Sequence, residues 1–229
     1  MSPFPDLPLF GGYLPTSFLD WEGRVVAVVF VKGCNFRCPF CHNAPLATGM
    51  AEGLEPGPVL ADLVRRKDFL DGVVISGGEP TLYPCLEELL AWVHEVAGLA
   101  VKLDTNGSNP SVLSRLLEKG LVDAAAMDVK APWDKYEVLA GVPVDTSRIV
   151  ESLEILDSLG DRLELRTTFV PHLMTVEDLV EIRRQLGSDP RWVVQLFEPN
   201  YALDPNLRET RRPERGEVIS ALKQVRVRG

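Results

Sequence analysis

The chain has 229 residues, 45% of them hydrophobic, so it can bury one substantial core, and we expect a single domain over residues 1–229. Its 33 acidic and 24 basic residues give a net charge of −9, which would repel a phosphate backbone, so we expect no nucleic-acid partner. No segment approaches the roughly 20 apolar residues of a membrane span and the first residues lack the pattern of a signal peptide, so we expect a cytoplasmic protein without a membrane partner.

Short apolar runs alternate along the chain with segments of helical periodicity. Residues 25–31 (VVAVVFV) form a continuous β-branched and aromatic run, which is typical of a strand buried on both faces of a parallel sheet. Similar runs predict five more strands, separated by amphipathic helices. The predicted strands are 25–31, 73–76, 100–103, 122–129, 163–170 and 192–197, and the predicted helices are 59–69, 86–96, 110–118, 146–159, 175–186 and 213–225.

Six strands that alternate with helices predict right-handed crossovers and a parallel sheet of the α/β class. Six are too few for a closed eight-stranded barrel of about 250 residues, so we expect an open, partial (β/α)6 barrel. The core barrel should span residues 24–200. A lead-in at 1–23 would precede it, and an extension with a last helix would follow it at 201–229.

Polar residues gather at or just after the ends of the predicted strands. In parallel α/β folds the carboxyl ends of the strands form the edge where ligands bind, so these residues are candidates for a site. They are Cys34, Gly77-Gly78-Glu79, Asp104-Thr105-Asn106, Asp128, Lys130 and Arg166.

Three of the four cysteines, Cys34, Cys38 and Cys41, lie on one short loop after the first predicted strand. Soft thiolates in this arrangement indicate metal ligands, and three of them would leave one iron of a four-iron cluster open. Two alternatives are haem attachment through the Cys-x-x-Cys-His pattern and a zinc site completed by His42. Haem would leave Cys34 without a role, and His42 follows Cys41 too closely to reach the same metal easily. We therefore favour iron–sulfur and expect Cys85 to be no ligand.

The spacing Cys-x-x-x-Cys-x-aromatic-Cys, with Phe40 as the aromatic residue, resembles the radical S-adenosylmethionine (SAM) superfamily. The segment Gly77-Gly78-Glu79-Pro80 resembles the one that binds the methionine amino group in that superfamily. The resemblance implies a [4Fe–4S] cluster on Cys34, Cys38 and Cys41, with Phe40 beside the adenine. It also implies that SAM chelates the open iron and that one electron cleaves SAM to a 5′-deoxyadenosyl radical.

Two further segments resemble the activases of glycyl radical enzymes. Members similar to pyruvate formate-lyase activase place Asp-Thr and Met-Asp pairs around a monovalent cation, and a lysine and an arginine near SAM. Without the resemblance, Arg166 could equally be a residue that extends past the rim of the sheet into solvent. The resemblance implies a cation site at Asp104, Thr105, Met127 and Asp128, and SAM binding by Phe40, Gly77, Gly78, Glu79, Asp104, Thr105, Lys130 and Arg166.

The segments VVISGGEPTL, VKLDTNGSNP and AMDVKAP are most similar to anaerobic ribonucleoside-triphosphate reductase activating proteins. This resemblance implies a glycyl radical enzyme as partner, such as anaerobic ribonucleotide reductase, and an electron donor such as flavodoxin or ferredoxin. The lateral gap of an open barrel would admit a peptide loop of that partner. Two alternatives remain: a radical SAM enzyme that acts on a small molecule or peptide, and a non-catalytic zinc protein.

Overall fold

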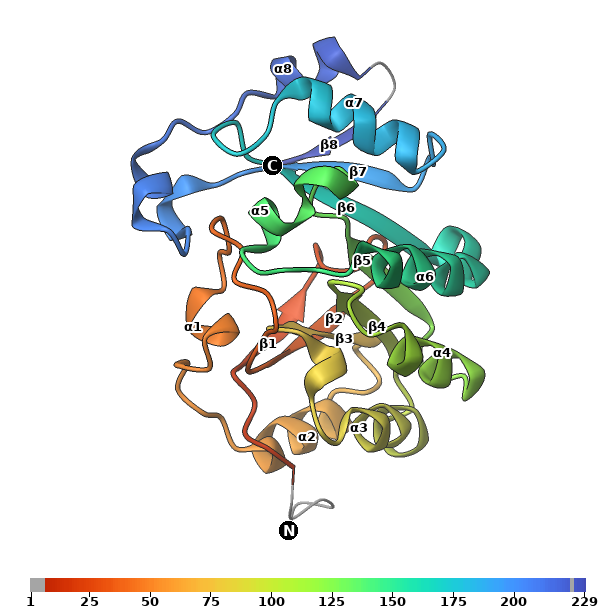
Figure 1. Ribbon diagram of the computed structural model, residues 1–229. Helices are drawn as coiled ribbons and strands as arrows, with labels where there is room; N and C mark the ends of the chain where they lie inside the picture. The colour runs from red at the N-terminus through yellow and green to blue at the C-terminus, as the bar shows by residue number, and fades with distance from the viewer. Residues whose placement is uncertain (1–6, 223–224) are drawn as a thin grey trace.

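The computed structural model describes residues 7–222 and 225–229, and its centre is a curved sheet whose strand order follows the chain (Figure 1). The first strand is antiparallel to the second, and every later pair is parallel. Within the described residues β1 and β8 each pair with one neighbour, so the barrel is open. The strands are β1 (Gly12–Ser17), β2 (Val26–Val31), β3 (Gly72–Gly77), β4 (Ala100–Thr105), β5 (Ala124–Asp128), β6 (Leu163–Phe169), β7 (Trp192–Leu196) and β8 (Arg226–Arg228).

The predicted parallel α/β sheet is confirmed, and its six predicted strands correspond to β2 through β7. Two more strands extend it, one from the lead-in and one from the C-terminal extension. β1 contains Gly12 and Pro15, which are rare inside strands and are tolerated here because β1 is an edge strand. β8 has three residues, too few for a periodic pattern.

The predicted last helix, 213–225, is too long. Helix α8 spans Arg215–Ala221, and the chain then enters β8 at Arg226. Residues 223–224 lie outside the described residues. The arginines of β8 are exposed and Val227 is buried, an alternation that belongs to a strand on a sheet edge.

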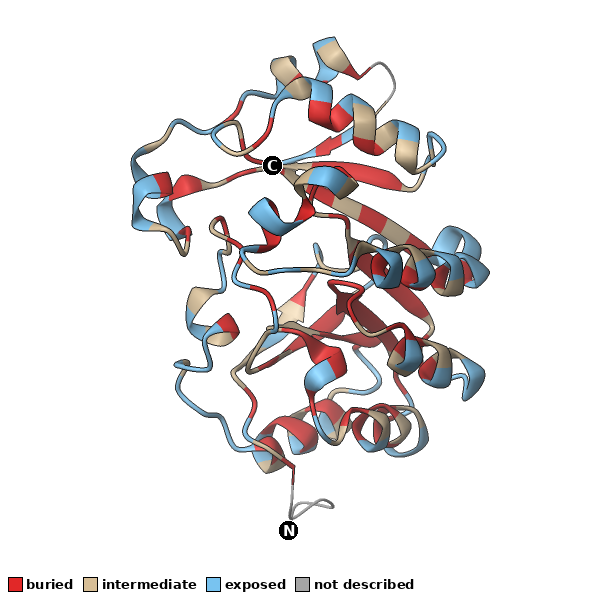
Figure 2. Cartoon of the chain, in the orientation of Figure 1, coloured by how far each residue is buried: buried red, intermediate tan, exposed pale blue. Residues whose placement is uncertain are grey.

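Helices cover the outer face of the sheet, with their exposed sides turned to solvent (Figures 1 and 2). Several begin with a proline in the first turn, which lacks the N–H that a helix start would leave unpaired. None of the helices in the described residues combines the length and apolar composition needed to cross a membrane. The covering helices are α2 (Pro56–Arg65), α3 (Leu86–Trp92), α4 (Pro110–Glu118), α6 (Thr146–Leu156) and α7 (Val176–Gln185), and shorter ones are α1 (Ala44–Ala47) and α5 (Tyr136–Ala140).

The two faces of the sheet differ in chemistry because successive strand residues point to opposite sides. Residues such as Ile75, Leu103 and Leu165 belong to the large apolar core under the helices. On the inner face, Val26, Val28 and Val74 form a separate small cluster. The inner face of β4, β5 and β6 instead carries charged residues, and this half of the barrel interior holds the candidate site.

Candidate functional site

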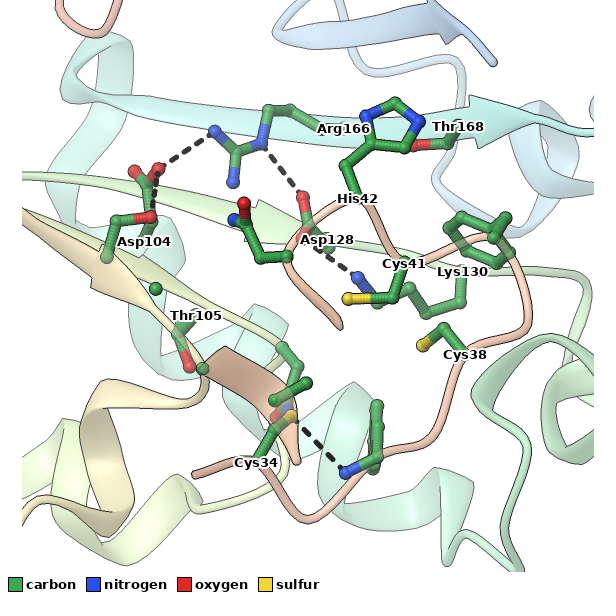
Figure 3. Close-up of a pocket in the computed structure, with 18 of the residues that line it drawn as sticks. Cys34, Cys38, Cys41, His42, Asp104, Thr105, Asp128, Lys130, Arg166 and Thr168 are labelled. Atoms are coloured by element: carbon green, nitrogen blue, oxygen red, sulfur yellow. Dashed lines mark hydrogen bonds and ion pairs between the residues drawn. The ribbon is translucent and has the colours of Figure 1, made fainter. Parts of the chain in front are cut away.

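The cysteine loop leaves the end of β2 and is backed by helix α1. The amide of Gly33 donates to Leu46 O (2.8 Å) and that of Cys34 to Ala47 O (3.1 Å). Cys34, Cys38 and Cys41 all line one cavity of about 430 Å³ at the carboxyl edge of the sheet. Figure 3 shows the three thiols around the same hollow. The structure therefore brings together the three cysteines expected to hold a cluster.

A short helix that the sequence does not predict, α5, supports the loop from the other side. The amide of Arg37 donates to Ala140 O (2.8 Å), and its guanidinium donates to the carbonyls of Cys34 (2.5 Å) and Phe36 (2.8 Å). Helix α5 ends at Gly141, whose φ of 70° favours glycine. A Cβ atom at residue 141 would also overlap Arg37 O, so this glycine allows the helix end to touch the loop.

The turn after β3 approaches the cysteine loop at backbone distance. Gly78 N donates to Val31 O (2.9 Å), and Glu79 N donates to Gly33 O (2.8 Å). A Cβ atom at residue 78 would overlap the Gly33 carbonyl, and Gly77 has a φ of 113°. Both glycines also line the cavity. Glycine is thus needed here for close packing of two main chains as well as for access to a ligand.

The carboxylate of Glu79 does not line the cavity. The residue is 1% exposed, and Oε1 accepts from the hydroxyls of Thr81 (2.6 Å) and Thr105 (2.8 Å), while Oε2 accepts from Asn106 N (2.8 Å). Burial raises the pKa of Glu79 above its usual range. The side chain therefore ties the β3 turn to the β4 turn, and the residues of the β3 turn that line the cavity are Gly77 and Gly78.

Five charged side chains form a continuous chain of ion pairs inside the barrel. Lys102 Nζ lies 3.2 Å from Asp104 Oδ1, and Arg166 Nη1 lies 3.1 Å from Asp104 Oδ2. Arg166 Nε is 2.8 Å from Asp128 Oδ1, and Lys130 Nζ is 2.9 Å from Asp128 Oδ2. Figure 3 shows Arg166 between the two carboxylates. Three positive and two negative charges leave this chain with a net formal charge of +1.

Neighbouring charges oppose the effect of burial on the pKa of four of these side chains. Burial alone would raise the pKa of Asp104 and Asp128, but Arg166, followed by the lysine nearest each carboxyl, holds both below their usual range. Burial alone would lower the pKa of Arg166 and Lys130, but the carboxylates raise both. The Arg166 side chain is 14% exposed. Arg166 is therefore an interior residue, and the alternative of a side chain extending into solvent is wrong.

Two of the residues predicted to surround a monovalent cation have side chains that contact other groups of the protein. Thr105 lines the cavity, but its hydroxyl donates to Glu79. The Met127 side chain belongs to the apolar core on the outer face and packs on Gly107. The predicted residues whose atoms do line the one cavity are Cys34, Cys38, Phe40, Cys41, Gly77, Gly78, Asp104, Thr105, Asp128, Lys130 and Arg166.

The cavity also holds polar residues to which the sequence assigned no role. Thr168 and Gln195 face it from β6 and β7, Asn106 from the turn after β4, and His42 from the cysteine loop. Thr168 could have been found, because it lies two residues after Arg166 on the same strand and therefore on the same face. The ring of His42 stacks on Phe197, with centroids 5.9 Å apart. Cys85 precedes α3 and is not among the residues that line this cavity.

The thiols suit a cluster better than a single ion. Ligands of one zinc ion lie about 2.3 Å from it and so converge within about 4 Å of one another. Within the described residues no three or more His, Cys, Asp or Glu side chains are placed to hold one metal ion. A multi-iron cluster spreads its thiolates over several iron atoms, and the three cysteines of the loop line one shared cavity. Burial raises the pKa of Cys38 to about 11, so iron binding there would displace a proton.

Replacing Gly78 tests the close approach of turn and loop. We expect Gly78→Ala to lose bound iron after anoxic reconstitution, because the new methyl group would push Gly33 and the cysteine loop away. Gly216→Ala is the matched control, since a Cβ there meets no neighbour within 4 Å, and it should gain about 0.5–1 kcal/mol in helix α8. Iron analysis and thermal unfolding measure both effects. Full iron content in Gly78→Ala would contradict the packing argument.

Replacing Glu79 tests its structural role. Glu79→Ala should lower the free energy of unfolding by about 3 kcal/mol or more, because several buried donors lose their acceptor at about 1–3 kcal/mol each. Chemical denaturation of the iron-free protein measures this loss. Glu87→Ala, which removes a surface carboxylate paired with Lys119 and Arg115, should cost much less, because water screens these pairs. Equal losses in the two variants would show that the Glu79 network is not structural.

The comparisons with known proteins agree with the geometry. The model of the radical SAM superfamily matches residues 28–186. A putative glycyl-radical enzyme activating enzyme of Methanocaldococcus jannaschii is 33% identical over 92% of this chain and 88% of its own length. The pyruvate formate-lyase-activating enzyme of Clostridium pasteurianum is 31% identical over 70% of this chain and 67% of its own.

Two solved structures share the fold. Coproporphyrinogen III oxidase of Escherichia coli, a radical SAM enzyme, superposes with a TM-score of 0.59 at 16% identity, over 86% of this chain and 50% of that one. Streptococcus suis SuiB bound to its precursor peptide gives 0.56 at 18% identity, over 77% of this chain and 40% of that one. This chain thus matches half or less of either structure. The family match covers most of the sheet and the whole cysteine loop, and the chain therefore belongs to the radical SAM superfamily.

Proposed function

We propose that this protein binds a [4Fe–4S] cluster and SAM in the 430 Å³ cavity and installs a glycyl radical on a partner enzyme. The observation that carries the proposal is one shared cavity, which joins the three cysteines, the Gly77-Gly78 turn and the chain of buried charges. When bound, the cluster would supply the electron that cleaves SAM to a 5′-deoxyadenosyl radical.

The residues around the cavity supply complementary groups for the methionine end of SAM. The ion-pair chain has a net positive charge, so it would attract the SAM carboxylate, and Arg166 can donate to it from its planar guanidinium. The backbone of the Gly77-Gly78 turn would accept hydrogen bonds from the amino group. Phe40 lines the same cavity and would lie beside the adenine. Lys130 Nζ lies 6.0 Å from the centre of the Phe40 ring, so this residue connects the ion-pair chain with the part of the cavity proposed for the adenine.

The proposal does not include the predicted monovalent cation, because its expected ligands are engaged elsewhere. Both carboxylate oxygens of Asp128 already form ion pairs, one with Arg166 and the other with Lys130. The Thr105 hydroxyl donates to Glu79. The Met127 side chain lies on the other face of the sheet. A cation at Asp104 would lie beside the Lys102 ammonium.

The partner is inferred from the relatives named above, whose names refer to activation of glycyl radical enzymes. Their sequences match this chain over two thirds or more of its length, so we propose the same chemistry here, with an enzyme such as anaerobic ribonucleotide reductase as partner. A low-potential donor such as flavodoxin or ferredoxin would supply the electron. The single-domain organisation and the cytoplasmic location stay predictions.

Cysteine variants test the ligand assignment. Cys34→Ala, Cys38→Ala and Cys41→Ala should each lose the cluster and reduce SAM cleavage to background, since three thiolates are the fewest that can hold it. Cys85→Ala should keep its iron and cleavage, because Cys85 does not line the cavity. Iron analysis and chromatography of 5′-deoxyadenosine measure both. Iron loss in Cys85→Ala would overturn the assignment.

The glycyl radical itself tests the proposed function. Reduced protein, SAM and a candidate glycyl radical enzyme should together give the doublet of a glycyl radical in electron paramagnetic resonance. The Cys38→Ala variant, and a partner whose acceptor glycine is replaced by alanine, are the matched controls and should give none. Formation of 5′-deoxyadenosine without a doublet for any candidate partner would favour a small-molecule or peptide substrate instead.

A further inference from the structure

Lys102 is a buried cation that the prediction of a SAM site does not use. It lies on the inner face of β4 and is 6% exposed. Lysine is almost never this buried unless it is paired. Its Nζ has two partners, Asp104 Oδ1 at 3.2 Å and the carbonyl oxygen of Asp20 at 2.5 Å. Lys102 thus connects the Asp104 carboxylate with the main chain at Asp20, a residue that also lines the cavity.

The contact with Asp20 comes from a turn that closes the amino end of the barrel after β1. Ser17 Oγ accepts from the amides of Leu19 (3.1 Å) and Asp20 (3.3 Å) and donates to the Asp20 carboxylate. These bonds hold the turn in one conformation. The Asp20 carbonyl is therefore a fixed acceptor, and it keeps the ammonium of Lys102 at Asp104 rather than in solvent.

The two carboxylate oxygens of Asp104 differ in their partners, and the Lys102 ammonium lies beside the one that accepts no hydrogen bond in the described part of the chain. Its Oδ2 accepts from Arg166 (3.1 Å) and Ser76 (3.3 Å), whereas within the described residues its Oδ1 accepts no hydrogen bond. The nearest charge to Oδ1 is Lys102. A sodium or potassium ion bound to this oxygen would lie next to a positive charge, which repels it. The Lys102 ammonium thus already lies next to Oδ1, where a sodium or potassium ion would bind.

We infer that the Lys102 ammonium takes the place of a monovalent metal cation in this site and makes SAM binding independent of sodium and potassium. The inference rests on the proposed function, because it assigns Lys102 a positioning role within the SAM site. Lys102 holds Asp104 from the side opposite Arg166. Arg166 is thereby left with a fixed carboxylate on either side and its positive charge directed at the cavity.

The test measures SAM affinity of the anoxic, cluster-loaded protein by equilibrium dialysis, in chloride salts of sodium, potassium or tetramethylammonium at equal ionic strength. Wild type should bind SAM with the same affinity in all three salts. Lys102→Met should bind about tenfold more weakly in tetramethylammonium, the effect of about one charge-assisted contact. Sodium or potassium should restore most of that loss, because the metal ion can then enter.

Lys135→Met is the matched control, since Lys135 forms its ion pair with Asp178 outside the cavity, and it should behave like wild type. A wild-type protein that needs sodium or potassium to bind SAM would overturn this inference alone, whether or not Lys102→Met folds. A folded Lys102→Met variant that gains no dependence on these ions would do the same. A cluster-loaded wild type that binds no SAM in any salt would overturn the proposed function as well.

Discussion

The buried chain of ion pairs between β4, β5 and β6 is the constraint on which the site depends. Charges in an apolar interior are costly unless each has a partner, so the five side chains can stay inside the barrel only together. Register makes this possible. Asp128 lies opposite Arg166 in neighbouring strands, and Ala126 lies opposite Asp104, leaving room for the guanidinium to reach across β5. The result is a buried chain of five paired charges with a net formal charge of +1.

The same strands contribute to the apolar core with one face and to the candidate site with the other. Leu103, Met127 and Leu165 alternate with Asp104, Asp128 and Arg166, so each strand contributes to the apolar core under the helices and to the charged interior. Removing a core side chain would leave the charges in register but weaken the sheet. Removing Asp104 or Asp128 would leave a buried lysine without its ion-pair partner, at a cost of about 3–5 kcal/mol. The apolar core and the charged site therefore use different residues, but both depend on the register of the same strands.

The cysteine loop has no regular structure of its own and is held in place by three neighbours. Helix α1 binds its start, the Gly77-Gly78 turn lies against Gly33, and helix α5 receives Arg37. These contacts are mostly main-chain hydrogen bonds, and they depend on glycines at 78 and 141 that allow close approach. A loop fixed in this way can present three thiolates in one arrangement before iron binds, which is the preorganisation that a metal site requires.

The sequence by itself determined the parallel α/β sheet, the grouping of three cysteines on one loop and the sheet edge that carries the cavity, because these follow from local periodicity and spacing. It could not determine where Glu79 points, since that depends on Thr105 and Asn106, which lie more than 20 residues away. The sequence assigned no role to Lys102, because its contact with the Asp20 carbonyl comes from the turn after β1. The sequence also did not predict the strands β1 and β8, because a short edge strand is recognised by the strand it pairs with rather than by its own hydrophobic pattern. Tertiary structure decided these points, since side-chain partners and strand pairing come from segments distant in the chain.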